Sequence, residues 1–281
     1  MLTLPCAKIN LGLNIIAERA DGYHDLQTVF YPIPLNDVLE IKLMDPSFPH
    51  DYPCDLKVTG NAVDCDERCN LVVKAYSLLA ADFDIPPIHA HLYKRIPSQA
   101  GLGGGSSDGA YMIRLLDERF RLNIGIAEME RYAARLGSDC PFFITSEPAF
   151  ATGRGDILSP ADGPRGNLNG YFIAVVCPHI AVSTRAAYEN VKCKMPEKSC
   201  RDIVRQPIAS WKGNLTNDFE DSVFAAHPQL VSIKQKLYDL GALYAQMNGS
   251  GSSLYGIFNE LPPQEDFNKV FEGCFTFTSR L

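Results

Sequence analysis

Residues 96–108 read IPSQAGLGGGSSD, a stretch with four glycines within five positions and two serines after them. Glycines let a backbone approach a bound group closely and turn several N–H groups toward one point. Apolar residues recur at helical spacing directly after the loop, at Ala110, Ile113, Leu116 and Phe120. The loop is therefore predicted to lie between a strand and a helix N-terminus, where free N–H groups and the helix dipole favour a phosphate.

Two well-known phosphate loops do not match this stretch. A Walker A loop ends in Gly-Lys-Ser/Thr, and no lysine follows these glycines. The dinucleotide fingerprint Gly-x-Gly-x-x-Gly/Ala fails because, counted from Gly101 and Gly103, its last position is Ser106. The alternative is a flexible linker or a tight turn, and the strongly periodic helix that follows disfavours a linker.

Outside the loop, the hydrophobic pattern predicts a mixture of strands and helices. Strands are predicted at 8–16, 26–31, 37–43, 88–93, 171–177, 242–246 and 254–258, and helices at 70–81, 126–136, 184–191 and 230–240 besides the one after the loop. A further helical turn is expected to open at Pro141. Because these elements do not alternate strictly, we predict an α+β fold with mixed or antiparallel sheets.

The best candidate for a domain boundary is 159–170, SPADGPRGNLNG, which is rich in Pro, Gly and Asn and has no apolar period. It predicts an N-terminal domain at 1–157, which holds the glycine loop, and a C-terminal domain at 158–281. A chain of 281 residues suits two modest domains.

Composition excludes some classes of partner. The formal net charge is −7, so no basic excess exists to displace counterions from nucleic acid. No apolar run approaches the ~20 residues of a membrane span. The nine cysteines include no Cys-x-x-Cys pair, and reduced thiols in a cytoplasmic protein are the expectation.

With these residues in view, the chain resembles the GHMP kinases, which include galactose, homoserine, mevalonate and phosphomevalonate kinases. The resemblance rests on residues 7–11, 19–28, 70–75, 97–107, 137–143 and 248–253. It implies two α+β lobes with the active site in the cleft between them, ATP and Mg²⁺ as cofactors, and transfer of the γ-phosphoryl group to a small-molecule hydroxyl. The segment Asp21-Gly22-Tyr23-His24 resembles members that phosphorylate the tertiary C2 hydroxyl of a cytidine-diphosphate-linked methylerythritol in non-mevalonate isoprenoid synthesis.

The resemblance implies two catalytic residues. Asp139 would orient the substrate hydroxyl and accept its proton, whereas the plain alternative is a carboxylate that caps a helix. Lys8 would stabilise negative charge on the transferring phosphoryl group, whereas the alternative is a strand lysine that extends into solvent from an edge.

The same resemblance implies an ATP site made of Asn70, Lys94, Pro97, Ser98, Gly101, Leu102, Gly103, Gly104, Gly105, Ser106 and Ser107. Ser107 is also a weak candidate ligand for Mg²⁺. For Lys94 the alternative is a solvated strand end. Asp21 and Asp37 are expected to be turn residues without a role in the site.

For the substrate, the resemblance implies Asn10, Tyr23, His24, Thr184, Tyr188, Gly249 and Gly251. His24 would hydrogen-bond the cytosine edge and Tyr23 would stack on its face, with an ordinary surface turn as the alternative. Asn10 shares a strand face with Lys8 by the period of two. The match at 184–188 is loose, and a bare hairpin turn is the alternative for the two glycines.

Two departures from the family pattern, Cys6 and Cys140, look like conservative packing changes. Two other functions stay open: a GHMP kinase for another small molecule, and a catalytically silent nucleotide-binding protein on the same fold. The presence of both Lys8 and Asp139 argues against the silent protein. We expect a monomer or a weak homodimer.

Overall fold

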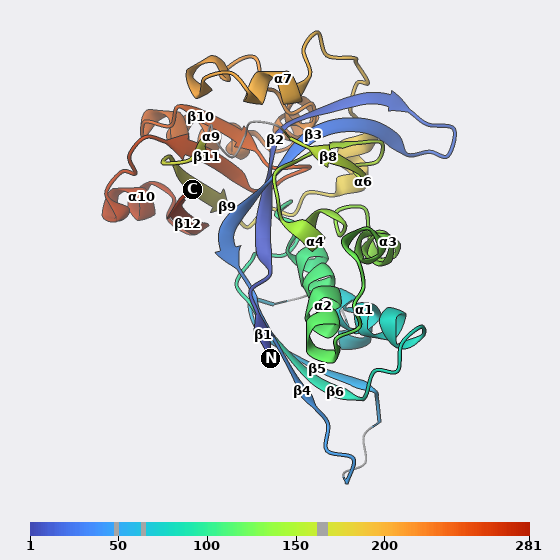
Figure 1. Cartoon of the computed structure of the whole chain (residues 1–281). Coiled ribbons are helices and arrows are strands. Elements are labelled where there is room, and N and C mark those ends of the chain that lie inside the picture. The colour runs from blue at the N-terminus through green and yellow to red at the C-terminus, as the bar shows by residue number, and fades with distance from the viewer. Residues whose placement is uncertain (48–50, 63–65, 162–167) are drawn as a thin grey trace. The chain divides into compact units, whose positions relative to one another are not determined.

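A computed structural model covers the chain and describes all residues except 48–50, 63–65 and 162–167 (Figure 1). The residues group into two compact units, neither of which is continuous in sequence. Unit 1 comprises Met1–Ala7, Leu35–Ser98 and Gly103–Glu147, and unit 2 comprises Lys8–Pro34, Gln99–Leu102 and Pro148–Leu281. The functional division predicted at residues 157 and 158 stays a prediction.

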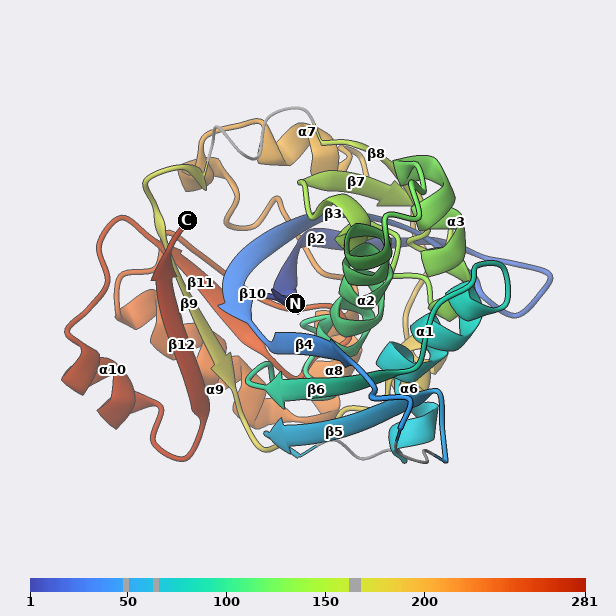
Figure 2. The same ribbon diagram turned by 60° about the horizontal axis from the view of Figure 1, so that its bottom comes forward.

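Unit 1 contains a four-stranded sheet in the order β1-β4-β6-β5. Its strands are β1 (Leu2–Thr3), β4 (Val38–Leu43), β5 (Cys54–Gly60) and β6 (Ile88–Lys94), and its helices are η1 (Glu67–Cys69), α1 (Leu71–Ala80), α2 (Gly104–Phe120), α3 (Ile126–Leu136) and α4 (Phe142–Thr145). β5 runs parallel to β6, whereas β4 is antiparallel to both of its neighbours. Helices α1 and α2 pack together, α1 against β5 and α2 against β4 (Figure 2).

The sequence pattern explains how these elements bury one face. Buried and exposed side chains alternate along β6. Ile88, Ala90 and Leu92 are buried, whereas the histidines and the tyrosine between them are exposed. Gly109 on α2 lies so close to α1 that a Cβ there would be 2.9 Å from the Cβ of Leu71. This close approach fixes α2, and with it the end of the glycine loop.

Unit 2 contains two four-stranded sheets, ordered β2-β3-β7-β8 and β10-β11-β9-β12. The strands are β2 (Cys6–Glu18) and β3 (His24–Asn36), which lie mainly in this unit, with β7 (Ala149–Thr152), β8 (Ile157–Pro160), β9 (Phe172–Cys177), β10 (Tyr244–Met247), β11 (Leu254–Phe258) and β12 (Phe275–Arg280). The helices are α6 (Thr184–Glu189), α7 (Cys200–Val204), η2 (Ile208–Ser210), α8 (Phe219–Ala226), α9 (Pro228–Asp239) and α10 (Gln264–Val270).

The core of unit 2 joins segments that are far apart in the sequence. Leu13 and Ile15 of β2 belong to one buried apolar cluster with Leu230 and Leu237 of α9 and with Phe258 of β11. Each such side chain contributes about 1.5–3 kcal/mol when it is fully buried. The core therefore anchors β2, which carries two of the predicted site residues.

The helices and strands predicted from the sequence are all present, with ends displaced by a few residues, and the α+β class is confirmed. The predicted boundary at 159–170 falls partly on 162–167, outside the described residues, and its first residues end β8. In the described part of the chain, no helix has both the length and the apolar character needed to cross a membrane.

Candidate active site

The glycine loop ends in a helix N-terminus, as the sequence predicts. Gly103 precedes α2 with a φ of 74°, a left-handed conformation that glycine adopts without strain, and no described side chain caps this helix. The N–H of Ser107 donates to the carbonyl of Gly103 at 2.9 Å. The N–H groups that come before it in the first turn have no carbonyl acceptor within the helix, so they are available to an anion.

The two glycines of the first turn differ in their surroundings. A Cβ on Gly104 would lie 2.9 Å from Cγ2 of Ile96 and 3.3 Å from Nζ of Lys94, whereas a Cβ on Gly105 would have no described atom within 4 Å. Ser107 is fully buried, and its hydroxyl has no hydrogen-bond partner among the described residues. The open space at Gly105, beside an uncapped helix, fits a phosphate group. The Ser107 hydroxyl is suited to coordinate a metal ion bound to that phosphate.

Lys94 is not a solvated strand end, because it is only 4% exposed. Its ammonium pairs with Asp37 and, at 2.6 Å, with Asp108 of α2. Burial by itself lowers the pKa of Lys94, but the charges of Asp108 and Asp37 outweigh that effect and raise the pKa. The ion pairs attach the start of α2 to β6, and the predicted contact of Lys94 with ATP stays a prediction.

Asp37, which the sequence suggests is only a turn residue, is completely buried. One of its oxygens pairs with Lys94, and the other accepts hydrogen bonds from the N–H groups of Arg95 at 2.6 Å and Ile96 at 2.8 Å. Burial raises the pKa of Asp108 to about 8, against the opposing charge of Lys94. Burial of the Asp108 carboxyl is thus costly, and the ammonium of Lys94 offsets part of that cost.

Asp139 lies half-buried in the turn between α3 and α4. Helix α4 begins after Pro141, which makes no side-chain cap hydrogen bond, and the catalytic role of Asp139 stays a prediction. Burial raises the pKa of the neighbouring Cys140 thiol to about 12, although a hydrogen bond with Ser106 lowers it. That bond connects the segment of Asp139 to the first turn of α2.

Asn70 caps α1 by accepting the N–H of Val72 at 3.0 Å.

In unit 2, Lys8 is 4% exposed, so it is not a lysine that extends into solvent from a strand edge. Its ammonium donates to Oδ1 of Asn10 at 2.6 Å and lies 5.1 Å from the ring centre of Phe30. Its backbone N–H donates to the carbonyl of Leu102 at 2.9 Å. Strand β2 therefore holds both a buried cation and the beginning of the glycine loop.

Asn248 connects three segments that the sequence associates with the site. Its Oδ1 accepts the N–H of Asn10 at 2.8 Å, and its Nδ2 donates to the carbonyls of Gly101 at 3.0 Å and Lys8 at 3.3 Å. A Cβ on Gly101 would lie 2.4 Å from the Asn248 carbonyl oxygen, so only glycine fits there. Asn248 begins the predicted C-terminal glycine motif, but no local sequence pattern marks it as a site residue.

Two of the predicted substrate residues lie ring against ring. The rings of His24 and Tyr188 are 4.9 Å apart at 31°, and Tyr188 meets Phe219 edge to face at 4.8 Å. Tyr23 is 57% exposed, with the guanidinium of Arg154 5.0 Å from its ring centre. The described contacts thus bring together His24 and Tyr188 but not Tyr23.

The predicted C-terminal glycine motif contacts two other predicted segments. The hydroxyl of Thr184 lies 3.0 Å from that of Ser250. A Cβ on Gly249 would lie 3.6 Å from Oδ1 of Asn10, and one on Gly251 would lie 3.0 Å from Sδ of Met247. The motif is therefore more than a bare hairpin turn, because it packs against β2 and the segment of Thr184.

Pro97 and Ser98 lie directly before the glycines of the loop, and the Ser98 hydroxyl donates to the carbonyl of Ala62 at 3.4 Å.

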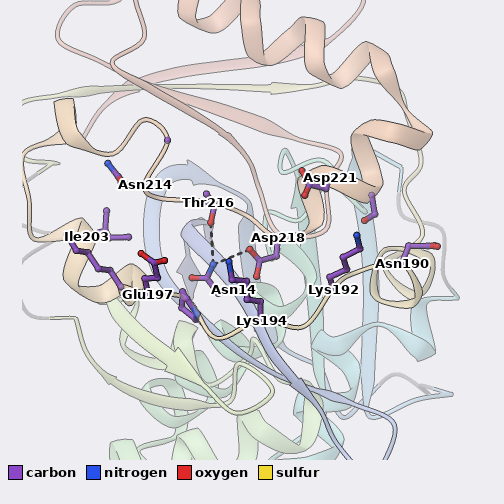
Figure 3. A pocket seen from close by; sticks show the side chains of 14 residues that line it. Asn14, Asn190, Lys192, Lys194, Glu197, Ile203, Asn214, Thr216, Asp218 and Asp221 are labelled. Carbon is purple, nitrogen blue, oxygen red and sulfur yellow. Dashed lines mark hydrogen bonds between the residues drawn. The ribbon is translucent and has the colours of Figure 1, made fainter.

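A pocket of about 770 Å³ in unit 2 contains none of the predicted site residues (Figure 3). Lysines and carboxylates both line it, among them Lys192, Lys194, Asp218 and Asp221. Burial raises the pKa of Asp218, which accepts a hydrogen bond from Asn14 at 3.2 Å. The mixed charge of the walls does not select an anion such as a phosphate.

Residues 70–147 match the GHMP kinases N terminal domain, and residues 201–274 match the GHMP kinases C terminal. A 4-diphosphocytidyl-2-C-methyl-D-erythritol kinase of Bacteroides fragilis is 48% identical over 282 residues, 100% of both chains. One from Bacteroides thetaiotaomicron is 50% identical over 98% of each chain. The chain belongs to the GHMP kinase family.

Solved structures of GHMP kinases have the same fold. A crystal structure of a 4-(cytidine 5'-diphospho)-2C-methyl-D-erythritol kinase gives a TM-score of 0.77 at 28% identity, over 99% of this chain and 98% of that one. The Methanococcus jannaschii mevalonate kinase, at 15% identity and a TM-score of 0.65 over 100% and 98%, shows the fold alone. The predicted GHMP kinase fold is confirmed, and the chain is an ATP-using phosphotransferase with an alcohol acceptor.

Proposed function

We propose that this chain transfers the γ-phosphoryl group of ATP to the C2 hydroxyl of 4-diphosphocytidyl-2-C-methyl-D-erythritol, in the non-mevalonate route to isoprenoid precursors. The observation that carries the proposal is the 48% sequence identity, over the full length, to a kinase named for this substrate. The contact of His24 with Tyr188 supports it, because an aromatic pair suits a nucleobase.

The first turn of α2 would hold the phosphates of ATP. Its uncapped N–H groups and the open space at Gly105 fit phosphate oxygens. The Ser107 hydroxyl would contribute a ligand to Mg²⁺, which neutralises charge on the phosphates when bound. Among the described residues no three His, Cys, Asp or Glu side chains group into a metal site, which agrees with an ion held mainly by phosphates and water.

Lys8 and Asp139 would act on the reacting atoms. The Lys8 ammonium, fixed by Asn10, would stabilise negative charge on the transferring phosphoryl group. Asp139 would orient the C2 hydroxyl. A carboxylate is a much weaker base than an alkoxide, so it accepts the hydroxyl proton late, as the new bond to phosphorus forms. The products are ADP and a phosphate monoester.

His24 and Tyr188 would recognise the cytosine. Stacking on an aromatic face is worth about 1–3 kcal/mol per base. Thr184 and the motif of Gly249 and Gly251 lie together and would contact the rest of the substrate. Tyr23, which is exposed, stays a predicted stacking residue that the described contacts do not bring to this pair.

Turnover tests the proposal directly. Purified protein with ATP and Mg²⁺ should phosphorylate the cytidyl substrate with a kcat/KM at least about 1,000-fold above that for mevalonate or homoserine, since a site built for a hydrogen-bonded base rejects ligands without it. Asp139→Ala should lose turnover but bind ATP normally, and an unchanged kcat would remove Asp139 from the mechanism. If the cytidyl substrate yields no phosphate monoester, the proposed activity is refuted.

A further inference from the structure

The hydroxyl of Thr28 ends a buried chain of hydrogen bonds that begins at Lys8. Thr28, on β3, is 1% exposed, and Asn10, on β2, is 2% exposed. Lys8 donates to Oδ1 of Asn10 at 2.6 Å, and Nδ2 of Asn10 donates to Oγ1 of Thr28 at 2.9 Å. Oγ1 of Thr28 donates to the carbonyl of Gly12 at 2.6 Å. All four residues belong to unit 2.

The chemistry of the two ends fixes the direction of this chain. An ammonium has donors only, and a carbonyl only accepts. The single proton of the Thr28 hydroxyl is used on Gly12, so Thr28 must accept from Asn10. Asn10 therefore presents its NH₂ group to Thr28 and its oxygen to Lys8. The orientation of this amide follows from its partners and not from its shape, since the two ends of an amide are nearly isosteric.

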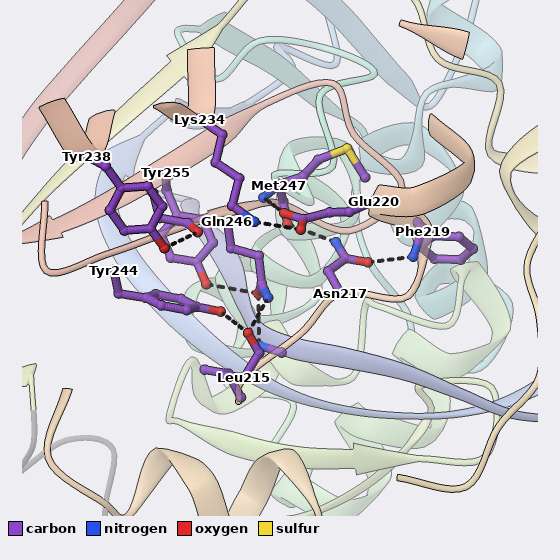
Figure 4. Close-up of polar contacts among 12 residues, drawn as sticks. Leu215, Asn217, Phe219, Glu220, Lys234, Tyr238, Tyr244, Gln246, Met247 and Tyr255 are labelled. Carbon is purple, nitrogen blue, oxygen red and sulfur yellow. Dashed lines mark hydrogen bonds and ion pairs between the residues drawn. The ribbon is translucent and has the colours of Figure 1, made fainter. Parts of the chain in front are cut away.

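The acceptor at the far end is itself held in place. Gly12 has a φ of 71°, and a Cβ there would lie 2.6 Å from Cδ1 of Leu215, so the backbone turns where only glycine fits. Its N–H donates to Oε1 of Gln246 at 3.0 Å, and Gln246 donates through Nε2 to the carbonyl of Leu215 at 3.1 Å. Figure 4 shows Gln246 and Leu215 within a larger set of buried polar contacts.

We propose that Thr28 is a positioning residue for Lys8, because its hydroxyl sets the orientation of the Asn10 amide that holds the ammonium. The inference rests on the proposed function, in which Lys8 stabilises the transferring phosphoryl group. Without the hydroxyl, the buried NH₂ group of Asn10 loses its acceptor, so the amide is no longer held in place and its oxygen shifts away from the ammonium. The effect should fall on the chemical step and not on the binding of either substrate.

Kinetics of Thr28→Val and Thr28→Ser test the proposal. Valine keeps the shape and removes the hydroxyl, so kcat should fall about 10–100-fold, as misplacement of a reacting group does, while both KM values stay within about threefold. Serine keeps the hydroxyl and should restore kcat to within about threefold. Tyr238→Phe is the control, since it removes another hydrogen bond of unit 2, to the Ala245 carbonyl at 3.2 Å, and should leave kcat unchanged.

Two results would overturn the inference: a Thr28→Val enzyme with normal kcat, or equal losses in the valine and serine variants. If valine prevents folding, Thr28→Ala takes its place. Crystal structures of the unliganded wild type and variant give a readout independent of activity. The Asn10 amide should shift in the variant until neither of its terminal atoms lies within hydrogen-bond distance of Lys8 Nζ, a change that can be seen without telling oxygen from nitrogen. An amide that stays in place would refute the role of Thr28. This comparison of structures tests whether Thr28 positions Lys8 even if the wild type does not phosphorylate the cytidyl substrate.

Discussion

The side-chain amide of Asn248 donates a hydrogen bond to the carbonyl oxygen of Gly101 at 3.0 Å, although the two residues are 147 positions apart. The same side chain contacts the backbone of β2 at Lys8 and Asn10. One buried amide therefore sets the beginning of the glycine loop relative to the strand of the predicted catalytic lysine. Three of the segments that identify the family in the sequence depend on this residue.

Replacing Asn248 with alanine should lower both stability and activity. The change leaves the buried N–H of Asn10 and the partly buried carbonyl of Gly101 without their partner, and an unsatisfied buried polar group costs about 1–3 kcal/mol. We expect the free energy of unfolding in urea to fall by about 2–4 kcal/mol. Asn190→Ala is the control, because this exposed amide also donates to a carbonyl, that of Ala186 at 2.9 Å. Equal losses in both variants would contradict the role of Asn248.

The two adjacent glycines of α2 should respond in opposite ways to alanine. Gly105→Ala adds a methyl group where no described atom lies within 4 Å, so stability should not fall, yet the methyl group should obstruct phosphate and weaken ATP binding at least about tenfold. Gly104→Ala forces a Cβ to 2.9 Å from Ile96 and should cost about 1–3 kcal/mol of unfolding free energy. Calorimetry measures both quantities. Normal ATP affinity in the Gly105 variant would place the phosphates elsewhere.

Changes at the aromatic pair should separate the two substrates. His24→Ala and Tyr188→Ala should raise the KM for the cytidyl substrate by about 10–100-fold, in line with one stacking or hydrogen-bond contact to a base, and leave the KM for ATP within about threefold. Tyr188→Phe keeps the ring and should behave as the wild type. Initial rates at varied concentrations of each substrate provide the test. A parallel rise in both KM values would argue against recognition of the base by this pair.

An alkylating reagent should label the exposed cysteines of the native protein and leave the buried ones unlabelled. Burial raises the pKa of Cys54, Cys140, Cys177 and Cys200 to about 12, so these thiols stay protonated as the pH rises through 8. Only the thiolate reacts, so native protein at pH 8 should be labelled at the exposed Cys69 and Cys193 and not at those four. Peptide mass spectrometry reads each site, and labelling in urea supplies the control. Rapid labelling of Cys140 in the native protein would contradict its burial beside Ser106.

The sequence predicts those parts of the fold that local patterns decide. The helix after the glycine loop, with apolar residues from Ala110 to Phe120, is visible from its period alone. Strands β5 and β12 were not predicted, because their burial is only partial and their partners are distant. β5 pairs with β6 more than 30 residues later, and β12 pairs with β9. Pairing between strands that are distant in the sequence leaves little pattern in the residues of either strand.

The candidate site shows the same limit. Lys8 and His24 could be chosen because their segments resemble a family, but Asp37 has the sequence context of a turn and gains its role from the buried ammonium of Lys94. Thr28 and Asn248 act through hydrogen bonds to other parts of the chain, which no spacing encodes. Polar residues that position others become visible only when their partners are known.

A crystal structure with a non-hydrolysable ATP analogue and the cytidyl substrate bound together would locate both reacting groups. Phosphate oxygens should lie on the backbone N–H groups of Gly104, Gly105 and Ser106. The C2 hydroxyl should lie within about 3 Å of the Asp139 carboxylate, with the Lys8 ammonium on the γ-phosphate. Phosphates bound away from the first turn of α2, or a hydroxyl out of reach of both Asp139 and Lys8, would contradict the proposed mechanism.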